Sequence, residues 1–334
     1  LLRRRKRKPR ALMGLVDVFG FVTVLLHGAD LVARTVLLGS IAFFVFVSGS
    51  ALADRARVGA AVEASVRKAI QTAALVALAA VAAATLVNAA VLHVSLAVAP
   101  AEIVGARFVA FGIVRASAAA AILAIVAMRP LADAPTRIAL LMLGGLSLCA
   151  ALAASHAAAR LTDSTVVLTA TFAHQLGAAL WLGGLPAFRL ALAHSPTPRA
   201  AADIARHYSL QSMAGVALIV AGAAVFAVVY IGSLPGAYGT AYGAMALTKT
   251  AMLALLLLLG LHNFRASRSI IADSRALPAL TRFVVLEMGI GFAVLMAAAS
   301  MTSTPPAVDL AEDRVSLSEL AARLLGALPE EAAG

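Results

Sequence analysis

Long apolar stretches alternate with short polar segments along almost the whole chain. Nearly every apolar stretch has about 20 residues, the length that an α-helix needs to cross the hydrocarbon core of a bilayer. The eight predicted spans are Leu31–Leu52, Ala69–Val94, Arg107–Met128, Ile138–Ala158, Val166–Phe188, Ser209–Ile231, Gly243–His262 and Phe283–Ser300. We therefore expect an all-α fold, a polytopic transmembrane helix bundle with eight core spans.

The first apolar stretch, Ala11–His27, is shorter than the others and contains Asp17. Its composition is compatible with a secretory signal, but no small-residue cleavage pattern follows it before the next apolar stretch begins. The sequence leaves open whether it forms a short ninth span or lies along the membrane surface. Met13 is an alternative start residue, and a start there would remove the basic tract Leu1–Arg10.

The predicted organisation is a single membrane domain with polar ends. Residues 1–10 form the basic tract, residues 11–300 the transmembrane bundle, and residues 301–334 a C-terminal tail. The tail begins with the pair Pro305-Pro306, and its pattern predicts one short amphipathic helix near Ser316–Leu325.

Composition and charge placement support the membrane class and exclude nucleic-acid binding. The chain is 62% hydrophobic and only 13% charged, although its formal net charge is +11. Seven Lys and Arg residues lie in Leu1–Arg10. The loops after the first, third, fifth and seventh predicted spans carry thirteen further Lys and Arg residues. The alternate loops carry only three, counting Arg34 just inside the first span. Basic loops face the cytoplasm, so we expect the C-terminal tail on the outer, periplasmic side of a bacterial inner membrane.

The sequence shows no enzymatic or nucleotide-binding motif. The single cysteine, Cys149, excludes an intrachain disulfide and a paired-thiolate site. Gly243–Thr250 resembles a phosphate-binding loop, but Thr248 stands where the second glycine is needed and the segment is apolar. We therefore expect no enzyme. Transport by such a chain would use a gradient or a chaperone partner.

Histidines near the outer ends of the spans are the best candidate metal ligands. His156 and His174 flank a polar turn within Ser155–Leu185, the stretch around which the chain is organised, and His93 lies near an outer end. Imidazole suits copper, zinc or iron, and a histidine inside a membrane span needs a functional or packing explanation. His27 is a weaker candidate at the same side. Packing against a neighbouring helix is the alternative for His174.

Other unusual intramembrane residues are Lys249, Glu287, Arg115 and the only tryptophan, Trp181. Lys249 and Glu287 are predicted at different depths, so we do not expect a direct ion pair, and Lys249 has the alternative of snorkelling to the interface. Three further side chains complete the candidates. Glu102 is expected to pair with Arg115 or to recruit a metal, and Met245 and Met301 are soft candidate ligands for copper, although methionine in a span more often packs.

Several short motifs occur in a fixed order along the second half of the chain. They are Ala154–His156, His174 followed after six residues by Trp181-x-Gly183-Gly184, Tyr242-Gly243 followed after five residues by Lys249, Leu286-Glu287, and Thr302–Pro306. In this order they resemble the copper resistance D (CopD) family of bacterial inner-membrane proteins. The resemblance covers most of the chain and is densest over residues 156–306. One departure is Ser155-His156-Ala157, where the family has Gly-His-Ala.

The resemblance implies a copper transport or copper-handling protein. Such a protein would accept copper ions from the periplasmic side, move them through intramembrane histidines, and work with a periplasmic copper-binding partner. Two alternatives stay open. Paired histidines could hold a b-type haem in an electron-transfer protein, or the chain could be an assembly factor for a copper oxidase.

Overall fold

The computed structural model describes residues 10–48, 58–155, 158, 163–195, 197–273, 275–301 and 304–324, and every regular element among them is helical. The predicted all-α bundle is confirmed, since eight helices are long and apolar enough to cross a membrane. These candidate spans are Phe19–Val47, Ala60–Val94, Arg107–Met128, Ala134–Ala153, Ser164–Ala193, Pro198–Ile231, Ala241–Arg268 and Ala276–Ser300. His156 lies outside the described residues.

The N-terminal segment is not a separate ninth span. Helix α1 runs from Arg10 to Ala42 without a break and continues as the π-helix η1 over Phe43–Ser48. No proline interrupts this stretch, and glycine is tolerated inside membrane helices when neighbouring helices pack against it. Residues 11–27 therefore form the first turns of the first span.

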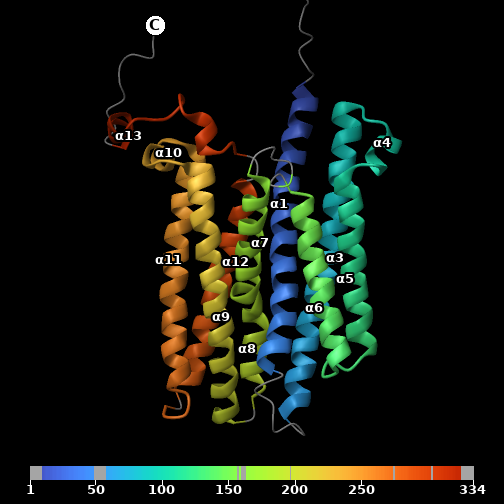
Figure 1. The fold of residues 1–334 in the computed structure, drawn as a ribbon, viewed down its shortest axis with the longest axis vertical. Coiled ribbons are helices and arrows are strands. Elements are labelled where there is room, and N and C mark those ends of the chain that lie inside the picture. The colour runs from blue at the N-terminus through green and yellow to red at the C-terminus, as the bar shows by residue number, and fades with distance from the viewer. Residues whose placement is uncertain are drawn as a thin grey trace, which may run out of the picture.

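Three groups of helices stand side by side in the bundle (Figure 1). α3 (Val58–Leu96), α5 (Arg107–Met128) and α6 (Ala134–Ala153) lie on one side. α9 (Pro198–Phe226, continued by η4, Ala227–Ile231), α11 (Ala241–Arg268) and α12 (Ala276–Ser300) lie on the other. Between them stand α1 and the span formed by α7 (Ser164–Leu180), η3 (Leu182–Gly184) and α8 (Leu185–Ala193).

The two central spans form the core. The buried share of the apolar 18-residue stretch is 72% in the span Phe19–Val47 of α1 and η1 and 67% in Ser164–Ala193. In the span formed by α11 it is only 6%. The stretch on which the sequence analysis centred is thus one of the two most enclosed spans. The exposed apolar side chains of the peripheral helices are suited to contact with lipid.

Short elements cap one end of the bundle, which we call the outer end in keeping with the loop charges. They are α4 (Pro100–Val104), α10 (Leu234–Gly239), η6 (Ala307–Leu310) and α13 (Leu317–Leu324), and Figure 1 shows α4, α10 and α13 there together with the beginning of α1. Thr240 starts α11 by accepting a hydrogen bond from the Gly243 amide at 3.0 Å, the usual N-cap contact. The predicted short helix of the tail is present as α13.

Some glycines of the spans lie at close contacts between helices, and others do not. A Cβ atom on Gly183 would collide with the backbone of Thr35 on α1, and one on Gly39 would collide with the Gly183-Gly184 backbone. Gly291 is similarly enclosed by Leu182. In contrast, an added Cβ on Gly145 or Gly289 would meet nothing within 4 Å.

Candidate functional site

The span Ser164–Ala193 is broken in the middle of the bundle. α7 ends at Leu180, Trp181 has φ −90° and ψ −79°, and a three-residue 3₁₀ turn leads into α8. Pro186 in the first turn of α8 has no N–H to continue the earlier helix. Such a break leaves backbone carbonyls without helical partners, and within a membrane other groups must supply them.

Two side chains of α9 supply these partners. The Tyr208 hydroxyl donates to the carbonyl oxygen of Trp181 at 2.5 Å, and the Gln211 amide donates to that of Leu180 at 2.9 Å. Tyr208 is buried and stacks on Phe188 of α8, with ring centroids 4.2 Å apart. The break is therefore held by side chains of α9.

Next to the break lies what we call the central cluster, formed by Trp181, Asn263 and Glu287. The Trp181 indole N–H donates to Glu287 Oε1 at 2.6 Å, and the Asn263 side-chain amide donates to Oε2 at 2.5 Å. Glu287 is only 2% exposed. It lies eleven residues after the start of α12, roughly 16 Å along a 25-residue helix. This position is close to the middle of α12.

His174 is oriented by a neighbouring helix. Its Nδ1 lies 3.0 Å from the carbonyl oxygen of Ile219 on α9. A carbonyl can only accept, so Nδ1 carries the proton and Nε2 keeps its lone pair. Metal-ligating histidines are commonly oriented by a bond of this kind through their second ring nitrogen. The His174 ring also packs edge-on against Phe226, with centroids 5.4 Å apart.

Lys249 lies in the same part of the bundle. Its ammonium is close enough to His174 for an electrostatic interaction, and it donates to the sulfur of Met301 at 2.6 Å. Met245 lies one turn before Lys249 on α11, and the Thr304 hydroxyl approaches its sulfur at 3.7 Å. We call His174, Met245, Lys249 and Met301 the outer cluster, because His174, Met245 and Lys249 lie in the outer halves of the spans Ser164–Ala193 and Ala241–Arg268, and Met301 is the C-cap at the outer end of α12.

The two clusters are separate. Lys249 donates to Met301, whereas Glu287 accepts from Trp181 and Asn263, so the structure agrees that these two charged residues do not form a direct ion pair. Lys249 and Asn263 lie on α11, while Glu287 lies on α12 and Met301 caps its end, and α11 packs against α12. The two clusters therefore lie at different heights along one helix pair.

Arg115 has a different partner from the one expected. The sequence analysis favoured Glu102, but Arg115 on α5 pairs with buried Asp30 on α1, while Glu102 is exposed on α4. Arg34, one turn after Asp30, interacts electrostatically with both. The spacing of Asp30 and Arg34 on α1 places them on one helix face, so this buried ionic group ties α1 to α5.

The remaining candidate histidines lie elsewhere. His93 is exposed at the outer end of α3, where its Nδ1 lies 3.0 Å from the Val98 carbonyl oxygen, and α3 packs against α1 and α5. His27 is exposed on α1. Among the described residues, no group of three or more His, Cys, Asp or Glu side chains forms a metal site. The described part of the chain therefore brings His174 together with methionines and a lysine.

Sequence reasoning missed Asn263, Tyr208 and Gln211. Asn263 and Gln211 are amides within predicted spans or at their edges, and Tyr208 directly precedes the predicted start of its span. Polar side chains inside membrane helices commonly form interhelical hydrogen bonds. That signal was present in the sequence, but the partners depend on which helices are neighbours.

A family of known proteins matches the part of the chain that contains most residues of the two clusters. Residues 202–301 match the family model described as CopD, copper resistance protein D. Over this segment the chain is similar to that family. It contains Tyr208, Met245, Lys249, Asn263, Glu287 and Met301. The resemblance expected from the motifs is confirmed, and His174 and Trp181 precede the matched segment.

One curated relative is "Copper transport protein CutJ" of Bacillus subtilis (strain 168), which is 30% identical over 151 residues. The alignment covers 44% of this chain and 27% of the relative, so the chain corresponds to about a quarter of that protein's length. No solved structure matches the chain.

Proposed function

We propose that this multi-pass membrane protein transports copper, accepting the ion from the periplasmic side of a bacterial inner membrane. The observation that carries the proposal is the outer cluster, in which a histidine with a free Nε2 lone pair lies in one region with two thioethers. Imidazole and thioether are ligands that Cu(I) accepts. The family match over residues 202–301 and the printed name of the relative support the same metal.

In this proposal copper reaches the outer cluster from a periplasmic copper-binding partner. Met301 and Met245, near the outer ends of α12 and α11, receive the ion first, and His174 receives it deeper in the bundle. His93 and His156 remain candidates for capture nearer the surface. The direction of movement is inward, toward the side that carries most of the basic loop residues.

Reconstitution of the purified protein into vesicles tests this function. Cu(I) added outside should accumulate inside vesicles that contain the protein and not inside protein-free vesicles. The visible spectrum of the same preparation tests the haem alternative, because a Soret band would identify a b-type cytochrome. Absence of copper movement, together with loss of oxidase activity and normal copper content in cells lacking the protein, would favour the assembly-factor alternative.

A further inference from the structure

Glu287 is a buried acid without a cationic partner. The ion pairs formed by the described residues join Arg67 to Glu63 and Arg115 to Asp30, and neither includes Glu287. Both hydrogen bonds to its carboxyl group come from neutral donors, the Trp181 indole and the Asn263 amide. An ionised carboxylate in an apolar membrane interior is costly, whereas a neutral carboxylic acid is much less so.

A second observation concerns Asn263. Its Oδ1 atom is buried and has no hydrogen-bond partner, although its Nδ2 atom lies 2.5 Å from Glu287 Oε2. The two ends of an asparagine amide exchange places by a half-turn of the side chain. After that turn, Oδ1 would accept a hydrogen bond from a protonated Glu287. The pair is therefore built to accommodate the carboxyl group in both of its protonation states.

Several titratable groups on the helices around Glu287 have partners or positions of their own. They include Tyr208 on α9, Asp30 and Arg34 on α1, Arg189 on α8, and Lys249 and His262 on α11. The other described titratable side chains of α1, α11 and α12 are His27, Tyr242, Arg265, Arg268 and Arg282. Asp30 and Arg34 belong to the ionic group with Arg115, and Lys249 donates to Met301. His262 packs on the Phe283 ring, and Arg189 is exposed. Tyr208 interacts electrostatically with Glu287, and it is a neutral phenol at neutral pH.

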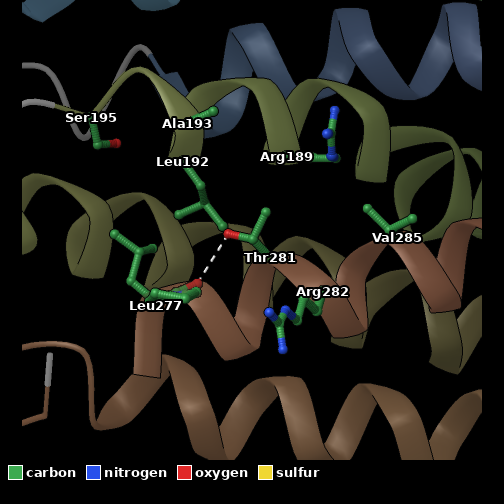
Figure 2. Close-up of a pocket in the computed structure, with 9 residues that line it drawn as sticks. Arg189, Leu192, Ala193, Ser195, Leu277, Thr281, Arg282 and Val285 are labelled. Atoms are coloured by element: carbon green, nitrogen blue, oxygen red, sulfur yellow. Dashed lines mark hydrogen bonds between the residues drawn. The ribbon is translucent and has the colours of Figure 1, made fainter. Parts of the chain in front are cut away.

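A cavity lies on the inner side of the bundle. Figure 2 shows this cavity between α8 and α12, with Arg189 on one helix and Thr281, Arg282 and Val285 on the other. Its volume is about 600 Å³, far above the roughly 30 Å³ that one water occupies in the liquid. Val285, which lines the cavity, is two residues before Glu287, a spacing that places the two side chains on opposite sides of α12. The cavity therefore adjoins the helix that carries Glu287 but does not open onto its carboxyl group.

We propose that Glu287 is a proton-binding site and that copper movement through the bundle is coupled to it. This inference rests on the proposed function. When a copper ion enters the central cluster, the O–H bond of the Glu287 carboxylic acid breaks and the proton passes to water on the inner side of the membrane. The carboxylate that remains balances the charge of the ion. When the ion leaves, the carboxylate takes up a proton from water on the outer side and becomes neutral again, so that one proton moves inward with each ion.

Glu287→Gln is the decisive variant, because glutamine imitates the protonated acid. Its carbonyl can accept from Trp181 and its amide can donate to Asn263 Oδ1, so the variant should fold like the unaltered protein. Gly260→Ala is the matched control. A Cβ atom there would lie 3.6 Å from the Trp181 ring and 3.7 Å from Glu287 Oε1, which are ordinary contacts.

Two readouts test the proposal. Infrared spectra of the unaltered protein without copper should contain a carboxylic-acid C=O band that shifts in D₂O, is lost in Glu287→Gln and is retained in Gly260→Ala. In vesicles holding a pH-sensitive dye, Cu(I) should produce a proton signal that Glu287→Gln lacks, with its copper flux reduced at least tenfold. A band that is absent in the unaltered protein or unchanged in Glu287→Gln would overturn the proton-binding site. Proton signals that are equal in both proteins would overturn the coupling.

The two proposals fail in distinguishable ways. If the unaltered protein moves no copper in the vesicles, the proposed function and the coupling both fail, while the copper-free infrared band still decides whether Glu287 holds a proton. If copper moves without any proton signal, the proposed function stands and the coupling is wrong.

Discussion

At the scale of single residues, the outer cluster places a lysine ammonium, which is costly inside a membrane, next to a methionine thioether. Lys249 donates to the Met301 sulfur and so occupies the thioether that the proposal assigns to copper. An ammonium cannot bind copper, because it has no lone pair. We infer that Lys249 positions Met301 and, by charge repulsion, keeps copper from being trapped in the outer cluster.

Replacing Lys249 tests this role. In Lys249→Gln the repulsion is lost, so the affinity for Cu(I) should rise by about tenfold, which corresponds to ~1.4 kcal/mol. The rate of transport should fall, because the ion leaves the outer cluster more slowly. Titration with a Cu(I) chelator and vesicle flux measure the two quantities. Lys68→Gln, an exposed lysine at the inner end of α3, is the control. If both quantities match those of the control, Lys249 only snorkels toward the interface.

At the scale of helices, glycines decide how closely α7 and α9 approach. A Cβ atom on Gly177 would lie 2.5 Å from the Gly215 carbonyl oxygen, and one on Gly215 would lie 2.7 Å from that of Gly177. Farther toward the outer end, a Cβ atom on Gly222 would lie 2.8 Å from the His174 Cβ atom. Small residues at such contacts let membrane helices pack backbone to backbone. This packing sets the position of His174 relative to Ile219.

Gly222→Ala should therefore disturb both the helix pair and His174. Forcing an extra methyl group into a well-packed contact costs roughly 1–3 kcal/mol of unfolding free energy. Denaturant unfolding in detergent and Cu(I) titration measure the loss of stability and of binding. Gly289→Ala, where the added methyl group meets nothing within 4 Å, should leave both unchanged. Equal stability of the two variants would show that α7 and α9 do not depend on this contact.

The sequence and the structure agree on the helices because hydropathy and span length are local properties. The sequence prediction and the structure differ where a side-chain contact depends on which helices pack against each other. The join of residues 11–27 to the first span was not foreseen, since no residue there marks a helix end or its absence. Asp30 as the partner of Arg115, and Asn263 as a partner of Glu287, could not be chosen without knowing that α1 meets α5 and α11 meets α12. His174 and Trp181 were found because polar or unique residues in apolar stretches stand out.

At the scale of the whole molecule, orientation remains a prediction from charge. Helix α1 begins with Arg10 at the outer end of the bundle, and the tract Leu1–Arg10, with seven Lys and Arg, precedes it in the sequence. The short loops between spans favour the opposite end as cytoplasmic, by thirteen basic residues to three. The basic tract favours the orientation in which the beginning of α1 is cytoplasmic, whereas the loops favour the opposite orientation. Our predicted orientation is the one that the loops favour.

Reporter fusions decide between them. A cytoplasmic reporter fused after Arg199 should be active, and a periplasmic reporter fused after Pro306 should be active, because these residues lie at opposite ends of the bundle (Figure 1). The same compartment for both fusions would contradict the bundle itself. Exchanged compartments would show that the basic tract determines insertion, and copper would then enter from the cytoplasmic side.

The central claim is that copper passes through the outer cluster, and flux through a His174→Ala variant tests it most directly. The matched control is His207→Ala, because His207 is a half-buried histidine whose Nδ1 lies 2.8 Å from a carbonyl oxygen of its own helix. At equal protein content in vesicles, His174→Ala should lose Cu(I) affinity and flux by more than about tenfold, the smallest loss usual for outer-shell partners of a metal. His207→Ala should match the unaltered protein. Unchanged binding and flux in His174→Ala would contradict the account and make His174 a packing residue between α7 and α9.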